Sequence, residues 1–219
     1  MTENKKLKMA EMTREEVEER LEEFAAYKSV KETHEDTEQS LIEESSEEIE
    51  SEDVNIENSI VDKENLEEDL LSAEEVVSEV ESIPEEAPAP SLNDCDLSEL
   101  NLSDLNFLGI SIENANLTKT ILNRANLSHS SLVKTNLKNA NLTDANLSET
   151  DLLNADLSQA CLEDANLEGS SANGANFSEA QLERANLRKC KAIEAIFIKS
   201  NLNEVTCGQA DFSRADLTN

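Results

Sequence analysis

The side chains that most often perform chemistry in proteins are few in this sequence and lie far apart. The chain contains two histidines and four cysteines: His34, His129, Cys95, Cys161, Cys190 and Cys207. No two cysteines form a CxxC motif, and the histidines and cysteines do not have the spacing of a zinc site. We therefore expect reduced, buried or neutral thiols, with neither a metal site nor a disulfide framework.

Motifs that hold phosphates, activate a serine or bind a catalytic metal are also missing from the sequence. There is no P-loop, no GxGxxG, no GxSxG and no HExxH, and neither histidine has an obvious nucleophile beside it. Many aspartates belong to a repeat, so they do not indicate an acid/base pair. We therefore predict no catalytic residue, no cofactor and no enzymatic activity.

The charge of the chain excludes one class of partner. Its 219 residues carry 49 acidic and 18 basic side chains, a formal net charge of −31. Proteins that neutralise phosphates need a basic surface, so we expect no direct nucleic-acid binding, and an anionic membrane surface is disfavoured too. The sequence has neither a long uncharged apolar stretch nor an apolar signal-peptide core near Met1. We expect a cytoplasmic protein without a membrane span.

The composition changes near residue 91. Residues 1–91 hold 31 acidic and 8 basic side chains (net −23), whereas residues 92–219 hold 18 and 10 (net −8). The only prolines, Pro84, Pro88 and Pro90, lie at this junction, where they favour an extended linker. The sequence therefore predicts an acidic N-terminal region at 1–91 and a separate domain at 92–219.

Two short stretches of the acidic region have the pattern of an amphipathic helix. Thr13 to Glu16 fit a capping box that precedes apolar residues at helical spacing, which predicts a helix near 14–28. A second apolar stripe predicts a helix near 64–83. The remainder, including 29–62, is rich in Glu and Ser and is expected to be disordered. The sequence leaves open whether these helices cap the second domain, bind another protein or form only transiently.

Residues 92–219 repeat with a period of five. Every fifth residue from Leu92 to Leu217 is Leu, Phe or Ile, except at Ala172, Ala192 and Cys207. A small residue usually lies two positions before each central residue, and Asn or Asp often lies directly before it. Because neither a helix nor a strand has this period, the chain must turn once per repeat. The central residue and the residue two before it then face the interior, and the other three face outward.

These repeats resemble the A(D/N)LXX consensus of the pentapeptide-repeat family. Ala115-Asn116-Leu117, Ala145-Asn146-Leu147 and Ala155-Asp156-Leu157 are three examples, and the resemblance covers 92–219 without an insertion. The resemblance implies an all-β fold: a right-handed quadrilateral β-helix, which is a solenoid with four repeats per coil. With ~4.8 Å between paired strands, such a stack is roughly 30 Å long.

Departures from the repeat lead to local predictions. Bulky Leu100, Leu105 and Ile110 stand where small residues are usual, so we expect a modified end of the stack that meets a capping element, with 64–83 as the obvious candidate. Expansion of this coil without a cap is the alternative.

The interior positions of the repeat lead to two further predictions. Ala172 and Ala192, which lie four repeats apart, leave space that Phe177 and Phe197 on the neighbouring face would fill. Cys207 replaces a central leucine, and we expect a small buried thiol there.

The outward positions offer a candidate protein contact. Apolar residues at these positions include Val133, Leu153, Ile193, Ile196 and Ile198, and exposed apolar clusters often mark contacts. Charges are banded, with no acid in 114–142 and no base in 143–183, which would orient a partner. The repeats run to the last residues, and an uncapped coil there would favour a homodimer through the C-terminal coil.

The leading hypothesis is a non-catalytic scaffold that binds another protein, whose identity the sequence does not give. One alternative comes from the resemblance: some pentapeptide-repeat proteins mimic DNA and modulate DNA gyrase or a topoisomerase. The banded charges at 92–219, and the acidity concentrated in 1–91, weigh against this. A second alternative is a secreted bacterial effector. Because the family is frequent in bacteria, we expect a bacterial cytoplasm.

Overall fold

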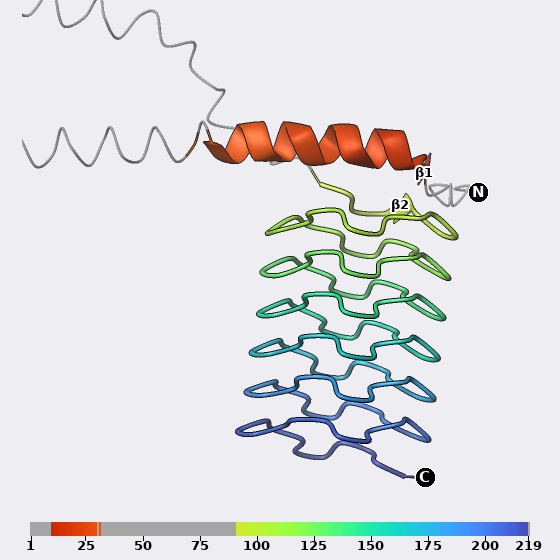
Figure 1. Cartoon of the computed structure of the whole chain (residues 1–219), viewed down its shortest axis with the longest axis vertical. Coiled ribbons are helices and arrows are strands. Elements are labelled where there is room, and N and C mark those ends of the chain that lie inside the picture. Colours follow the sequence, from red (N-terminus) through yellow and green to blue (C-terminus); the bar gives the residue numbers. More distant parts are fainter. Residues whose placement is uncertain (1–9, 30, 32–90, 219) are drawn as a thin grey trace, which may run out of the picture. The chain divides into compact units, whose positions relative to one another are not determined.

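The computed structural model describes residues 10–29, 31 and 91–218 of the chain. Residues 91–218 form a stack of coils, and residues 14–29 form a helix that follows a two-residue strand, β1 (Ala10–Glu11) (Figure 1). The helix expected at 64–83 lies outside the described residues, as do residues 30 and 32–62 of the stretch expected to be disordered. Ser29 and Lys31, which belong to that stretch, are helical. Of the described residues, 10–27 and 91–218 belong to one compact unit.

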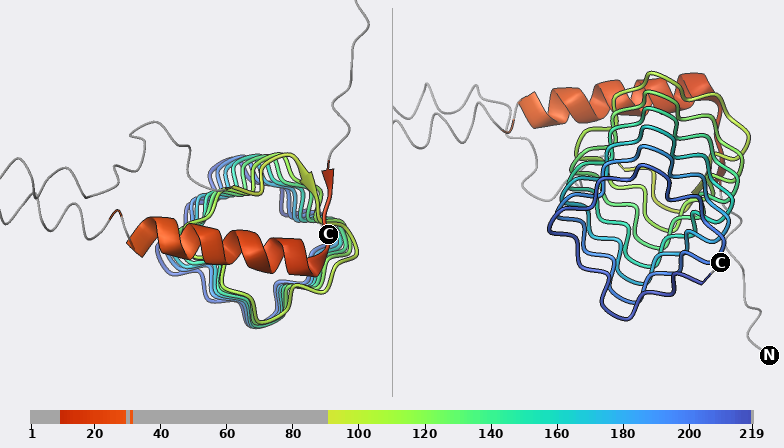
Figure 2. Two further views of the ribbon diagram at one scale, coloured as in Figure 1. Left: turned by 90° about the horizontal axis from the view of Figure 1, so that it is seen from above. Right: turned by 60° about the horizontal axis from the view of Figure 1, so that its bottom comes forward.

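Each coil of the stack contains four five-residue repeats. The residue before each central residue forms a parallel β-bridge with the equivalent residue four repeats later, from Asp96 with Asn116 to Ile196 with Asp216. Hydrogen bonds link the coils in both directions: the N–H of Leu97 donates to the carbonyl of Asn116 (2.8 Å), and the N–H of Asn116 donates to the carbonyl of Cys95 (2.9 Å). Successive coils therefore lie in register, one above the next (Figure 2).

A tight turn closes every repeat. Every fifth residue from Asp94 to Arg214 has a positive φ, and all of them except Gly109, Gly169 and Gly174 carry a side chain. A positive φ at the third residue is what a type II turn requires, and the N–H of Thr120 closes one such turn on the carbonyl of Leu117 (3.2 Å). This conformation costs a non-glycine residue roughly 1 kcal/mol, so the bonds between coils must hold the turns in place.

The polar residue before each central residue stabilises the turn that follows. The side-chain oxygen of Asn116 accepts hydrogen bonds from the N–H (3.2 Å) and the hydroxyl (2.6 Å) of Thr118. The same arrangement recurs at Asn126 with Ser128 and at Asn176 with Ser178. Asn and Asp accept such local bonds readily, which explains their frequency at this position of the repeat.

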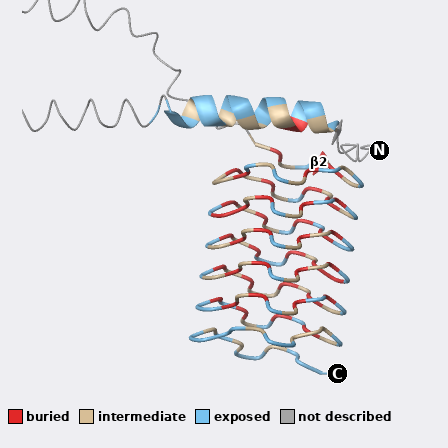
Figure 3. Ribbon diagram, viewed as in Figure 1, coloured by how far each residue is buried: buried red, intermediate tan, exposed pale blue. Residues whose placement is uncertain are grey.

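The core is a column of central residues inside the coils (Figure 3). Ala172 and Ala192 are fully buried there. Phe177 and Phe197 lie one coil apart, as the sequence predicts, and their rings stack with 4.8 Å between centroids and 3° between planes. The ring of Phe197 also meets that of Phe212 edge-on at 5.7 Å. Phe177, Phe197 and Phe212 thus form one continuous aromatic group.

Cys207 is exposed, so the prediction of a buried thiol at this position is wrong. It belongs to the last described coil, where central residues are covered from one side only, and the central Leu217 of that coil is 51% exposed. The repeat pattern identifies an interior position but does not say whether a neighbouring coil covers it. Cys95 and Cys190 are buried, and Cys161 is half-buried.

The helix at 14–29, which we call the capping helix, begins with a capping box. The N–H of Thr13 donates to Glu16 Oε2 (2.7 Å), and the N–H of Glu16 donates to Thr13 Oγ1 (3.2 Å). Val17 is fully buried in the core cluster, against which Leu21 and Phe24 also pack. An apolar stripe of the helix therefore continues the core of the stack.

The unusual bulky residues of the first coil belong to, or pack against, the core cluster that also contains Val17 of this helix. Leu100 and Leu105 are half-buried against the core cluster, and Ile110 is fully buried within it. The end of the stack is thus modified and capped, as expected. Among the described residues the capping element is the helix at 14–29; residues 64–83, the candidate that the sequence suggested, lie outside them.

Residues 10–20 also bind the backbone of the first coil. β1 pairs in parallel with β2 (Cys95–Asp96), and the N–H of Met12 donates to the carbonyl of Asp96 (3.1 Å). The guanidinium of Arg14 donates to the carbonyl of Asn101 (2.8 Å), and that of Arg20 donates to the carbonyl of Ser91 (2.7 Å). Unpaired edges of a sheet attract other strands, and these three bonds satisfy acceptors on the upper edge of the stack.

Candidate functional site

The outward side chains of the coils line up in ladders along the stack. Because each coil contains four repeats, residues that lie four repeats apart in the sequence occupy equivalent places one coil apart. Each ladder therefore combines residues that no local motif would connect. The candidate contact residues, the charges and the amides can all be placed on such ladders.

Val133, Leu153 and Ile193 belong to one ladder at a turn of the coil. The carbonyl of Val133 accepts from the N–H of Asn114, and the carbonyl of Leu153 accepts from the N–H of Lys134, which fixes them in successive coils. Leu153 is 38% exposed, and Val133 is half-buried. Asn173 stands between Leu153 and Ile193, and its side-chain oxygen accepts from the N–H of Ile193 (3.1 Å). The ladder is thus interrupted once by an amide.

Ile193, Ile196 and Ile198 follow one another along a single coil. Ile196 lies on the flat segment between two turns, bridges Asn176 in the coil before, and is 37% exposed. Ile193 and Ile198 lie at the turns on either side of it and are half-buried. The structure therefore brings together three of the five candidate residues on one coil and two, Val133 and Leu153, on earlier coils.

The charge bands of the sequence are connected by ion pairs along the stack. Ion pairs join turn residues of successive coils: Lys119 with Glu99 (2.9 Å), Arg124 with Asp104 (2.7 Å), Arg184 with Asp164 (2.8 Å), Arg214 with Glu194 (3.1 Å) and, when the imidazole is protonated, His129 with Glu149 (3.3 Å). Basic bands are therefore partly neutralised by the acids of neighbouring coils. These ion pairs could be predicted from the sequence, because each joins opposite charges that lie four repeats apart. Charges grouped by consecutive segments do not show this spacing.

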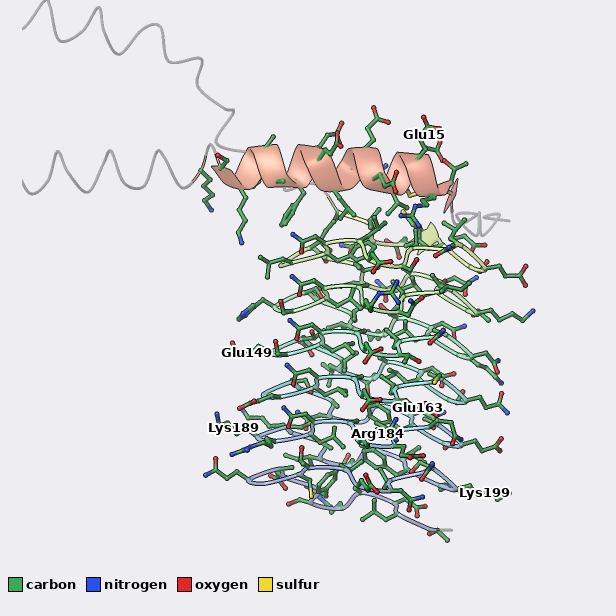
Figure 4. All side chains as sticks on the ribbon, in the orientation of Figure 1. Glu15, Glu149, Glu163, Arg184, Lys189 and Lys199 are labelled. Carbon is green, nitrogen blue, oxygen red and sulfur yellow. The ribbon has the colours of Figure 1, made fainter. Side chains whose placement is uncertain are left out.

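Arg184 makes the most extensive of these ion pairs. Its guanidinium donates two parallel hydrogen bonds to Asp164, each 2.8 Å, and a third to Glu183 (2.5 Å). The bonds and charge of Arg184 hold the pKa of Asp164 below its usual value, and Asp164 in turn raises the pKa of the guanidinium. Figure 4 shows Arg184 and the labelled Lys189 among the side chains of the lower coils. Lys189 binds Glu168 (2.9 Å), which lowers the pKa of that carboxyl.

A ladder of asparagine side chains runs along one face. Each amide after the first donates to the side-chain oxygen of the asparagine one coil before, at 2.9–3.2 Å. Its members are Asn106, Asn126, Asn146, Asn166 and Asn186. Their common spacing of four repeats places them at equivalent positions of successive coils.

The described residues include no group of three side chains able to hold a metal ion. Burial raises the pKa of Cys95 and Cys190, which favours the neutral thiol. Every buried side-chain nitrogen or oxygen in this part of the chain has a hydrogen-bond partner. No helix in the described part of the chain is long and apolar enough to cross a membrane.

Comparison with known proteins identifies the repeats. The family model for pentapeptide repeats, with eight copies, matches residues 91–128, 120–159, 151–188, 160–197 and 180–219. A comparison with curated proteins gives no match.

Solved structures of pentapeptide-repeat proteins are among the similar structures. A pentapeptide-repeat protein from the thylakoid lumen of Arabidopsis thaliana is 29% identical, with a TM-score of 0.35; the match covers 41% of this chain and 66% of that one, just under two thirds. HetL, a pentapeptide-repeat protein involved in heterocyst differentiation regulation from Nostoc sp. strain PCC 7120, is 21% identical over 56% of this chain and 85% of its own, with a TM-score of 0.26. QnrB1, a plasmid-mediated fluoroquinolone resistance protein, is 21% identical over 52% and 72%, with a TM-score of 0.34.

Together, the coils of four five-residue repeats and the family match over 91–219 show that this chain belongs to the pentapeptide-repeat family and that these residues form its β-helix.

Proposed function

We propose that this protein is a non-catalytic scaffold that binds another protein through the apolar surface formed by Val133, Leu153, Ile193, Ile196 and Ile198. The observation that carries the proposal is the exposure of Leu153 (38%) and Ile196 (37%) on a surface otherwise made mainly of polar ladders. Burying apolar area contributes roughly 25 cal/mol per Å², so a partner that covers these side chains gains affinity from them.

Rigidity of the stack supports this function. Ile193 and Ile196 are bonded to neighbouring coils through their backbones: the N–H of Ile196 donates to the carbonyl of Ala175 (2.9 Å), and the carbonyl of Ile193 accepts from the N–H of Gly174 (2.9 Å). Their positions are therefore set before a partner arrives. A pre-organised surface loses less conformational entropy on binding than a mobile one.

The test compares the partners that are captured by four full-length proteins. Three of these are the wild type and two surface variants, each of which is immobilised and incubated with bacterial lysate. One variant combines Ile193→Ser, Ile196→Ser and Ile198→Ser, and the other combines Val133→Ser and Leu153→Ser. Ile121→Ser is the matched control, because Ile121 is 39% exposed but lies outside the proposed surface. We expect a protein, identified by quantitative mass spectrometry, that the wild type and the control retain and that either surface variant loses at least tenfold. Equal capture by all four proteins would contradict the proposal.

The same proposal includes two finer features that the family resemblance implies: a right-handed quadrilateral form of the β-helix and a location in the bacterial cytoplasm. It also includes an acidic N-terminal region at 1–91, distinct from the repeats at 92–219, which the change in composition near residue 91 indicates. Four repeats per coil support the quadrilateral form.

The number of ion pairs that link successive coils weighs against the gyrase alternative, because a DNA mimic needs a continuous acidic face. A supercoiling assay tests this: inhibition of gyrase by low micromolar full-length protein would favour the mimic.

A further inference from the structure

The upper edge of the first coil carries a set of backbone carbonyl acceptors. Within the stack, each carbonyl before a central residue accepts from the N–H of a central residue one coil earlier, as Asn116 does from Leu97 (2.8 Å). In the first coil the equivalent carbonyls belong to Ser91, Asp96, Asn101 and Asn106. These four acceptors point toward the place that an earlier coil would occupy.

The capping segment, residues 10–29, occupies this place and reproduces part of an earlier coil. Met12 donates to Asp96 through its backbone, whereas Arg14 and Arg20 donate to Asn101 and Ser91 through their guanidinium groups. Asn106 is the one acceptor of the four for which the described residues provide no donor. The segment thus behaves as a ligand of the edge, with backbone, cationic and apolar contacts that match it.

The connection between this ligand and its site is long. Residues 32–90 separate the capping helix from the first coil in the sequence. Fully extended, roughly 60 residues span about 200 Å, several times the ~30 Å height of the stack. The covalent chain therefore does not dictate that a capping segment must bind the coil of its own molecule.

From these contacts we infer that the upper edge also accepts the capping segment of a second copy of this chain, so that two copies exchange caps and form a dimer. In such an exchange both edges stay capped, and every contact made within one molecule is remade between two. Because the capping segment is tethered to its own chain, binding within one chain is favoured when the protein is dilute. The fraction of chains that form the dimer therefore increases as the protein concentration rises.

The pairing of β1 with β2 allows a direct test. Ala10 is the backbone partner of Cys95, and neighbouring strands lie about 4.8 Å apart, within the range that a disulfide bridges. The variant Ala10→Cys is made in the full-length chain together with Cys161→Ser and Cys207→Ser, which removes the half-buried and exposed thiols. Unlabelled and ¹⁵N-labelled protein are mixed in equal amounts, unfolded, refolded together and oxidised, and the cross-linked peptides are analysed by mass spectrometry.

Cap exchange yields disulfides between residue 10 of a labelled chain and Cys95 of an unlabelled chain. We expect their share to rise from near zero at about 1 µM to above one tenth at about 500 µM, as mass action requires. Links that stay within one chain at every concentration would overturn the inference, and the absence of any link between residue 10 and Cys95 would overturn the pairing on which it is based. Glu11→Cys is the matched control, because Glu11 is opposite Asp96 and not opposite Cys95. This variant should form fewer links to Cys95 than Ala10→Cys does. Val17→Asp should reduce all links by removing the buried anchor of the cap.

Discussion

The ring of Phe197 lies parallel to that of Phe177 in the coil before, with 4.8 Å between their centroids. Phe197 also contacts Phe212, so it occupies the middle of the aromatic group. Because Phe197 is almost fully buried, removal of its ring would leave a cavity in the core.

Phe197→Ala should therefore lower the free energy of unfolding by about 3–5 kcal/mol, the range for a large buried aromatic residue. Phe212→Ala, in the partly buried last described coil, is the control and should cost less than half as much. Urea unfolding followed by circular dichroism measures both. Equal losses would show that the stacked ring makes no special contribution.

The asparagine ladder predicts a cost for removing one rung. Asn146 donates to Asn126 (3.2 Å), accepts from Asn166 (3.2 Å) and accepts from the N–H of Ser148 (3.2 Å). Asn146→Ala breaks all three bonds and should destabilise the fold by about 1–3 kcal/mol.

Asn123→Ala is the control for this variant, because the side chain of Asn123 is half-buried but is not a member of the ladder. Its effect should stay within about 0.5 kcal/mol in the same unfolding assay. A cost for Asn146→Ala as small as that of the control would contradict a stabilising ladder.

The pair between Asp164 and Arg184 predicts a dependence of stability on pH. The folded state lowers the pKa of Asp164, so the stabilisation is complete above the unfolded pKa of about 3.9. It is lost as the pH falls through the lower folded value. Asp164→Asn should therefore lower the melting temperature at pH 7, and the difference from wild type should shrink below pH 4 and in high salt.

Asp144→Asn is the matched change, at an equivalent turn one coil earlier where the carboxylate makes no ion pair with a described residue. Thermal unfolding at several pH values compares the two. If both variants show the same pH dependence, the guanidinium bonds are not its source.

Two glycines should respond differently to alanine. Gly174 has a φ of +65°, and a β-carbon there would lie 2.5 Å from Asn154 Oδ1, whereas no atom lies within 4 Å of a β-carbon at Gly208. Gly174→Ala should cost about 1–2 kcal/mol, because it adds both a left-handed conformation and a steric clash. Gly208→Ala should change the free energy of unfolding by less than about 0.5 kcal/mol. Thermal unfolding of the two variants tests the contrast, and an equal cost would contradict it.

The regular period explains why much of the β-helix is predictable. A five-residue period without insertions places Phe177 and Phe197 in successive coils, and the bulky Leu100 and Leu105 indicate a modified end. The pattern describes single repeats, however, whereas burial depends on both neighbouring coils. This is why Cys207, in an interior position, is exposed.

The cap and the surface depend on contacts between distant residues. The bonds from Arg14 to Asn101 and from Arg20 to Ser91 join a helix to backbone carbonyls. Because every residue has a backbone carbonyl, the sequence does not indicate which carbonyls accept these bonds. The sequence therefore did not indicate that the stripe near 14–28 contacts the first coil. The break between Leu153 and Ile193, by contrast, follows from Asn173 at the intermediate position, and counting in steps of four repeats would have found it.

The register of four repeats per coil also determines which changes in chain length leave the surface intact. A deletion of a single repeat between Leu153 and Ile193 would carry every later residue one face onward around the axis, so these two side chains would no longer share a ladder. A deletion of four consecutive repeats would instead shorten the stack by one coil and leave each side chain on its original face. Proteins built this way should gain and lose length in whole coils wherever a surface that spans several coils is under selection.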